Sequence, residues 1–168
     1  MEMLEHLKNR RSIRRFLPKV IEKEKIEKII QAACLSPSSK NTQPWEFFIV
    51  KNKQKIQALS KTQPYSAFLK TAPLVIVVVV DQKKSPGHFL EDGAIAAFSI
   101  LLEASDLGLG ACWNAVYHSS EKREDYVREI LNAPQNYRII CNIGIGYPDE
   151  KPGKKIVKSF DNAVEMIG

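Results

Sequence analysis

Apolar residues recur at helical spacing near the start of the chain, at Ile26, Ile29, Ile30 and Ala33, with Glu and Lys on the opposite face. This spacing predicts an amphipathic helix over residues 20–35. Pro18 and Pro37 stand on either side of the segment, where proline is typical of helix ends.

The most apolar run is APLVIVVVVD, residues 72–81. Its unbroken β-branched residues predict a strand that is covered on both faces. Further patterns predict strands at 45–51, 111–116 and 137–148, and helices at 52–61, 89–107 and 121–131. The absence of repeats or a linker, together with this alternation, predicts a single domain over 1–168 of the α+β class, a three-layer α-β-α sandwich around a mixed central sheet.

The predicted helix over 89–107 has an unusually wide apolar surface. One face carries Leu90, Ala94, Ala97 and Leu101, and a neighbouring face carries Ile95, Phe98 and Leu102. One sheet face requires a narrower stripe. Either a second subunit covers the extra surface, or the helix is buried within the monomer.

Charge adds a second observation, because the 168-residue chain has a formal net charge of +6. Much of the excess lies in NRRSIRR (9–15) and KPGKKIVK (151–158), two segments that could converge on one anion. Nucleic-acid modules interleave aromatics with arginines or show helix-turn-helix or zinc-finger patterns, and neither is present. This counts against nucleic acid, and an anionic cofactor and a lysine-rich surface are the other two explanations of the charge.

The chain lacks a signal-peptide pattern at its start, and its longest apolar run, 74–80, is too short to cross a bilayer. Cys34, Cys112 and Cys141 show no pairing pattern and lie in apolar contexts, so we expect reduced, buried thiols. The sequence therefore predicts a cytoplasmic protein with no membrane partner.

Several familiar site motifs are missing. GLGACW (108–113) and GIGYPD (144–149) each lack the third glycine of a dinucleotide fingerprint, and Gly144 and Gly146 are better explained by a close backbone approach. The three histidines are scattered, so no metal site is expected. No G-x-S-x-G nucleophile elbow is present.

Two polar stretches are more informative. RRSIRRF (10–16) has four arginines and a serine, and guanidinium groups bind phosphate in a bidentate manner. In an extended conformation, Ser12 and Arg14 would point to one side and Ile13 to the other. SPSSKNTQPWEF (36–47) carries more hydrogen-bonding side chains than a turn needs.

With these two stretches in this order, followed by APLVIVVVVD, LGLGACW and IGIGYP, the chain resembles the FMN-dependent nitroreductase family over nearly its whole length. The resemblance implies a compact, homodimeric member that binds FMN. It also implies that the polar loop reaches the FMN of the neighbouring subunit, through Pro37, Ser38, Ser39 and Asn41.

The resemblance further places Arg10, Arg11 and Ser12 at the FMN phosphate. Arg14 matches the position that holds a cation beside the N1 and C2 carbonyl edge of the flavin, where negative charge develops on reduction. Trp113, Asn114 and Ala115 are the candidates for backing the ring, although a plain core strand is the alternative. In the C-terminal segment, Lys155 and Lys158 are the candidates for closing on the phosphate, with non-functional exposed lysines as the alternative.

By resemblance, the reaction is ping-pong: NAD(P)H reduces flavin N5, and a nitroaromatic, quinone or other small acceptor then reoxidises it. Flavin N5 carries the chemistry, so no catalytic side chain is expected. Two alternatives stay open, a flavin store or sensor with little turnover and a basic nucleic-acid-binding module.

Overall fold

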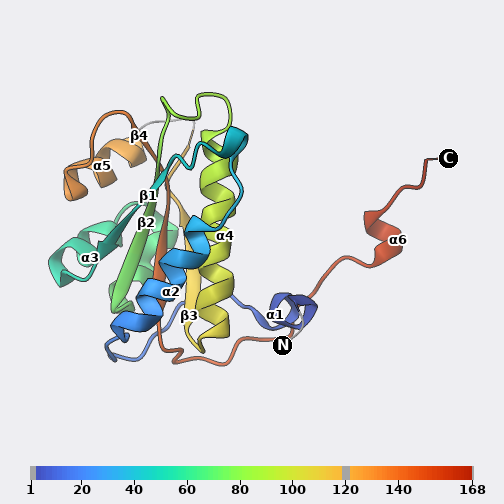
Figure 1. Cartoon of the computed structure of the whole chain (residues 1–168). Helices are drawn as coiled ribbons and strands as arrows, with labels where there is room; N and C mark the ends of the chain where they lie inside the picture. The colour runs from blue at the N-terminus through green and yellow to red at the C-terminus, as the bar shows by residue number, and fades with distance from the viewer. Residues whose placement is uncertain (1–2, 119–121, 168) are drawn as a thin grey trace.

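A computed structural model describes residues 3–118 and 122–167 (Figure 1). Its central sheet has the order β1-β2-β4-β3, and all neighbouring strands are antiparallel. The strands are β1 (Trp45–Val50), β2 (Leu74–Asp81), β3 (Gly110–Ala115) and β4 (Tyr137–Gly146). The sequence predicted a mixed sheet. Among the described residues, the parallel pairing is an isolated bridge between Ser12 and Ala111, at the edge of β3.

The strand β2 occupies a central position, as its apolar run predicts. Residues 74–80 are all buried, and β2 pairs with β1 on one side and β4 on the other. Its β-branched side chains feed two hydrophobic clusters, one on each face of the sheet.

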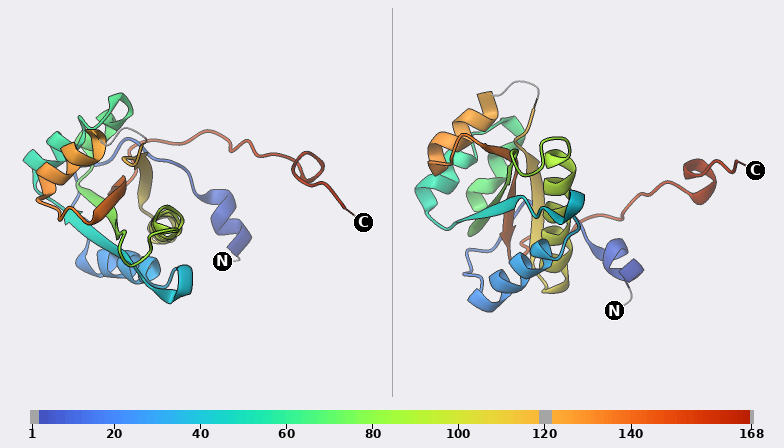
Figure 2. Two further views of the ribbon diagram at one scale, coloured as in Figure 1. Left: turned by 90° about the horizontal axis from the view of Figure 1, so that it is seen from above. Right: turned by 45° about the horizontal axis from the view of Figure 1, so that its top comes forward.

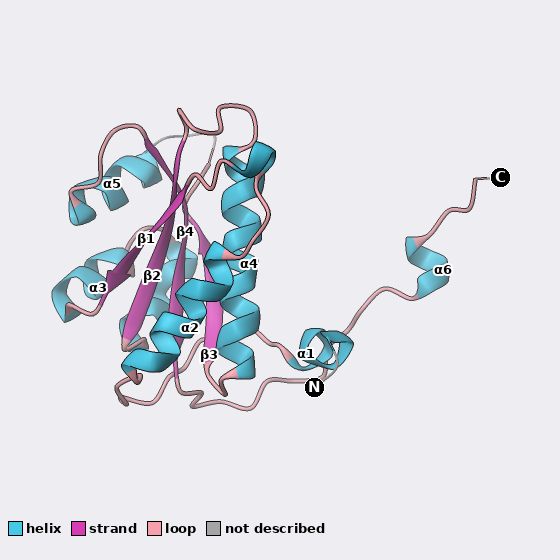
Figure 3. Cartoon of the chain, viewed as in Figure 1, coloured by secondary structure: helices cyan, strands magenta, loops and turns pink. Residues whose placement is uncertain are grey.

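Helices form the outer layers (Figures 2 and 3). One face is covered by α2 (Lys23–Cys34) and α4 (Phe89–Asp106), and the other by α3 (Lys53–Leu59), the 3-10 helix η2 (Pro64–Thr71) and α5 (Lys122–Leu131). The predicted α+β layers are therefore confirmed. The helix expected over 121–131 begins at Lys122, and position 121 lies outside the described residues.

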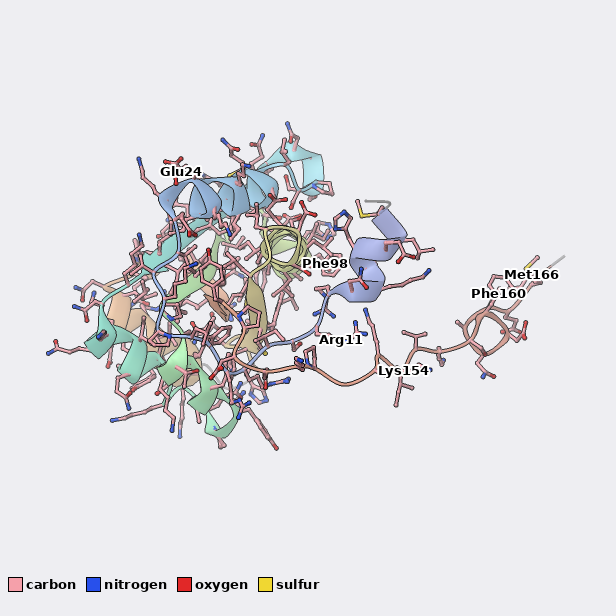
Figure 4. The ribbon with its side chains drawn as sticks, turned by 90° about the horizontal axis from the view of Figure 1, so that it is seen from below. Arg11, Glu24, Phe98, Lys154, Phe160 and Met166 are labelled. Atoms are coloured by element: carbon pink, nitrogen blue, oxygen red, sulfur yellow. The ribbon has the colours of Figure 1, made fainter. Side chains whose placement is uncertain are left out.

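Helix α4 is only partly covered within the chain. Ala97 and Leu101 are buried, whereas Leu90, Ile95 and Phe98 remain 39%, 40% and 43% exposed. Phe98 lies on the side of α4 that is turned away from the sheet (Figure 4). The wide apolar face predicted from the sequence is thus real, and part of it meets solvent in the single chain.

Both ends of the chain leave the sandwich. Helix α1 (Met3–Asn9) packs against α4, and the C-terminal arm, residues 151–167, runs outward and carries the short helix α6 (Phe160–Ala163) (Figures 1 and 2). The arm keeps large apolar side chains in solvent, with Ile156 95% and Met166 86% exposed. Neither helix is evident from the sequence pattern.

The glycines of β4 have the role expected of them. A Cβ on Gly144 would lie 2.9 Å from Leu69 Cδ2, and one on Gly146 would lie 2.7 Å from Pro73 Cδ. The prediction for the cysteines is wrong at one position, because Cys112 and Cys141 are buried but Cys34 is exposed. Cys34 is the last residue of α2. The preceding residue, Ala33, faces the core, and Cys34 therefore faces outward.

In the part of the chain that the structure covers, no helix is both long and apolar enough to cross a membrane. Within those same residues, no group of three or more His, Cys, Asp or Glu side chains is arranged to hold a metal ion.

Candidate functional site

The arginine segment, residues 10–16, lies along the free edge of β3. Ser12 forms the parallel bridge with Ala111, and the Ile13 N–H donates to the Ala111 carbonyl at 3.1 Å. Ile13 turns its side chain into the core, as the extended pattern predicts. The Glu150 carboxylate accepts from the N–H groups of Arg14 and Arg15, which fixes the second half of the segment.

Ser12 and Arg14 share a side of this segment. Both lie near the buried thiol of Cys112 in β3, where each acts to lower its pKa. Burial raises the pKa of Cys112, and these two groups only partly oppose that effect. Cys112 is therefore a neutral, buried thiol that lies beneath the arginine segment.

The beginning of the C-terminal arm closes a cationic cluster, which consists of Arg10, Arg11 and Lys155. Lys155 Nζ donates to the Leu7 carbonyl at 2.7 Å, and Arg11 Nε donates to the Gly153 carbonyl at 3.3 Å. Desolvation, together with Arg10 and Arg11, lowers the pKa of Lys155. The lowered pKa shows that the three positive groups repel one another. An anion such as phosphate could bind here and offset that repulsion.

Lys158 is not part of this cluster. It is exposed, further along the arm than Lys155. Figure 4 shows the same order in space, with Lys154 close to Arg11 and Phe160 far out along the arm. The geometry thus separates the two lysines that the sequence grouped together.

The polar loop around η1 (Ser39–Asn41) has an unusual backbone. Lys40, Asn41 and Gln43 have φ values of 51°, 55° and 45°, which is the left-handed region that non-glycine residues rarely adopt. Two hydrogen bonds within the loop support the turn: Ser38 Oγ accepts from the Gln43 N–H at 2.9 Å, and Thr42 Oγ1 donates to the Ser39 carbonyl at 3.0 Å. Such strain in a hydrogen-bonded loop is typical of ligand-contacting segments.

Helix α4 holds this loop at two points. Ser36 Oγ and Ser99 Oγ lie 2.7 Å apart, and the Asp92 carboxylate accepts from the Ser39 N–H at 2.9 Å. Asp92 was not identified from the sequence. The feature that could have indicated it is the presence of a carboxylate in the largely apolar segment FLEDGAIAAF, residues 89–98.

The loop and the arginine segment lie at opposite ends of α4 (Figure 1). Asp92 contacts the loop near the start of α4. Asp106 is the last residue of α4, and its Oδ1 lies 3.2 Å from Nδ1 of His6, which precedes the arginine segment in the chain. Fourteen residues of helix span about 20 Å. Within one chain, the two polar stretches therefore lie at opposite ends of this helix.

The three candidates on β3 have different surroundings. Trp113 packs beside the cluster formed by α2, α4 and the sheet, and Asn114 is buried on the other face, where its Oδ1 accepts from Ser66 Oγ at 2.8 Å. Ala115 is exposed. The Asn114 side chain is thus engaged with η2, and its main chain lies opposite Asn142 in the pairing of β3 with β4.

Comparison with known proteins gives a consistent result. The profile of the nitroreductase family matches residues 7–63 and 57–147. A protein of Methanothermobacter thermautotrophicus is 38% identical over 157 residues, which cover 92% of this chain and 82% of that protein. Its name is "Putative NADH dehydrogenase/NAD(P)H nitroreductase".

Solved structures show the same relationship. A protein of the same name from Parabacteroides distasonis superposes with a TM-score of 0.93 at 34% identity, covering 98% of this chain and 97% of the other. The FMN-dependent nitroreductase from Clostridium difficile has a TM-score of 0.86 at 42% identity, covering 92% of both chains.

Proposed function

Because this chain belongs to the nitroreductase family, we propose that it is an FMN-dependent oxidoreductase that takes electrons from NAD(P)H and passes them to a small acceptor. The observation that carries the proposal is the cationic cluster of Arg10, Arg11 and Lys155, assembled from two ends of the chain beside the arginine-segment edge of the sheet. The similarity to an FMN-dependent nitroreductase supports the choice of flavin.

The residues present fit a flavin mononucleotide. The cluster would hold the terminal phosphate, with Ser12 at its border, because guanidinium and ammonium donors match the phosphate oxygens. Arg14 lies further along the same strand-like segment, exposed above Cys112. From there its fixed charge would stabilise the negative charge that develops at the pyrimidine edge of the ring.

Bound FMN would supply the two-electron chemistry at N5, accepting hydride from NAD(P)H and then reducing a nitroaromatic, quinone or other small acceptor in a ping-pong sequence. The protein would supply position and charge, with Trp113, Asn114 and Ala115 of β3 as the stretch that backs the ring. No side chain is required as an acid or base, since solvent reaches the exposed residues Arg14 and Ala115.

We further propose a homodimer in which each site is shared. The polar loop and the arginine segment are about 20 Å apart along α4, and a flavin that lies between two chains would meet the loop of one and the arginine segment of the other. The half-exposed Ile95 and Phe98 on α4, and the solvent-facing apolar side chains of the arm, offer surface for a second copy. Pro37, Ser38, Ser39 and Asn41 would then contact the flavin of the partner.

The test begins with the purified protein. We expect a yellow protein that releases FMN on acid or heat treatment, and apoprotein that rebinds FMN at micromolar concentration. Release of FAD, or no binding of added FMN, would contradict the cofactor assignment. A colourless protein that binds nucleic acid would favour the basic-module alternative.

Turnover separates an enzyme from a flavin store. Steady-state oxidation of NADH and NADPH is measured with menadione and with nitrofurazone as acceptors. Parallel lines in double-reciprocal plots would support the ping-pong sequence. Stoichiometric FMN with negligible turnover would support the flavin store or sensor instead.

A further inference from the structure

Asp92 is a buried carboxylate that the flavin chemistry proposed above does not use. It lies in the first turns of α4 and is 3% exposed. Both of its oxygens accept hydrogen bonds, Oδ1 from the Ser39 N–H at 2.9 Å and Oδ2 from Ser85 Oγ at 2.6 Å. Burying a carboxylate is unfavourable unless such bonds replace its water, so these two contacts account for its position.

The Ser39 contact is made at the point where the loop becomes strained. Lys40 and Asn41 follow directly, and both have positive φ values. Backbone in this region persists only where the surrounding structure over-determines it. The hydrogen bonds within residues 38–43 are internal to the loop, whereas the Asp92 bond, together with the Ser36–Ser99 contact just before these residues, ties the loop to α4.

We propose that Asp92 is a positioning residue that holds the loop of residues 38–43 in the conformation that contacts FMN. The inference rests on the proposed function, in which Ser39 and Asn41 face the flavin of the partner subunit. Asp92 does not touch the cofactor. It acts through the Ser39 main chain, which sets the direction of the next two residues.

Ser85 completes the arrangement. Its side chain is 3% exposed, and its hydroxyl donates to the oxygen of Asp92 that Ser39 does not use. This bond fixes the plane of the carboxylate, so that the first oxygen stays aimed at the Ser39 N–H. The N-terminal end of α4 favours the negative charge as well.

The experiment compares Asp92→Ala with Glu91→Ala. Glu91 is the preceding residue and its side chain is 64% exposed, so its replacement removes the same charge from the same helix end without touching the loop. For Asp92→Ala we expect FMN binding to weaken about tenfold or more, because the Ser39 N–H loses its partner. Glu91→Ala should stay within about twofold, as for other surface substitutions.

The conservative variant provides a rescue. In Asp92→Asn the amide oxygen can still face the Ser39 N–H while the amide nitrogen donates to Ser85. We therefore expect FMN affinity close to that of the unmodified protein, together with an unaltered visible circular dichroism of the bound flavin. If Asp92→Ala does not fold, Ser85→Ala replaces it, because Asp92 then loses the bond that fixes the plane of its carboxylate and its hold on the Ser39 N–H should weaken.

A second readout does not depend on the cofactor. Lys40 is exposed within the loop, so trypsin cleavage after Lys40 reports how often the loop opens in the apoprotein. Asp92→Ala should accelerate this cleavage about fivefold or more. Glu91→Ala should not change it, and cleavage after Lys53 should be equal in all variants.

The two possible failures are distinct. Folded Asp92→Ala with unchanged FMN affinity, unchanged flavin dichroism and unchanged cleavage at Lys40 would overturn the inference. A lower melting temperature with these three readouts unchanged would also overturn it, because the role would then be purely structural. Failure of the unmodified protein to bind FMN would instead reject the proposed function, and the inference with it, even if cleavage at Lys40 still showed Asp92 anchoring the loop.

Discussion

Gly110 and Ile13 are in direct contact, at the point where the arginine segment runs beside β3. A Cβ on Gly110 would lie 2.7 Å from Ile13 Cβ, and its two next nearest atoms also belong to Ile13. The first of these distances ends on a Cβ atom, which cannot move without its backbone. The absence of a side chain at Gly110 therefore lets residues 12–14 lie flat on the edge of the sheet.

The first prediction follows from this contact. Gly110→Ala should lift Ile13 and displace Ser12 and Arg14, so FMN affinity should fall about tenfold or more, with a loss of stability of about 1 to 3 kcal/mol from overpacking. Gly87→Ala is the control, because nothing lies within 4 Å of a Cβ there. FMN titration and denaturant unfolding measure the two effects. Equal behaviour of both variants would contradict the account.

Local patterns predicted much of the fold. The β-branched run at 72–81 and the helical spacing of Ile26, Ile29 and Ala33 each depend on neighbouring residues, and both elements formed where expected. The Ile13–Gly110 contact is different, since it joins residues about a hundred positions apart. The sequence shows that position 110 is a glycine, but no periodic pattern predicts that Ile13 packs against it.

The candidate site shows the same division. The composition of the polar loop and of the arginine segment predicted that both bind a ligand, and this stays a prediction. The Asp92–Ser39 bond joins residues 53 positions apart, and the arm reaches Arg11 from Gly153, 142 positions away. Such partners depend on the packing of whole helices, which sequence spacing does not specify.

The second prediction concerns Arg14. Replacement with Gln removes the charge beside the pyrimidine edge, so the two-electron midpoint potential of bound FMN should fall and FMN binding should weaken. Loss of one charged interaction is worth roughly 1 to 3 kcal/mol, which is within reach of dye-linked potentiometry. Arg15→Gln is the matched control, since Arg15 instead donates to the Asp149 carbonyl. An unchanged potential in Arg14→Gln would assign the role to another residue.

The third prediction is a pH dependence. The pKa of Lys155 is lowered by desolvation and by Arg10 and Arg11, and a bound phosphate would offset the two arginines and raise that pKa again. Binding is then coupled to proton uptake, so FMN affinity should fall as pH rises toward the ordinary lysine range. Isothermal titration in buffers of different ionisation enthalpy measures the protons taken up.

Two variants identify the lysine responsible. Lys155→Met should bind FMN more weakly and lose the alkaline pH dependence, because the titrating group is gone. Lys158→Met should keep both the affinity and the pH dependence, since Lys158 is exposed on the arm beyond the cluster. The opposite pattern would place Lys158 at the phosphate and leave Lys155 as a structural contact to Leu7.

The last prediction tests whether each site is shared between two chains. Arg14→Ala and Asn41→Ala should each strongly reduce activity, because one removes the flavin counter-charge and the other a contact from the loop. In a mixed dimer with shared sites, one site carries both lesions and the other carries neither. With random pairing, co-expression should therefore restore about a quarter of all sites, given a two-fold dimer.

A matched pair controls for dimer formation itself. Arg14→Ala co-expressed with Arg10→Ala should restore nothing, because both residues belong to the arginine segment and every site keeps one lesion. Activity per mixed dimer is measured after separation by two affinity tags. If Arg14→Ala and Asn41→Ala also restore nothing in verified mixed dimers, each site lies within one chain. The loop would then have to reach the arginine segment across the length of α4, which requires a different arrangement of the loop from the one described.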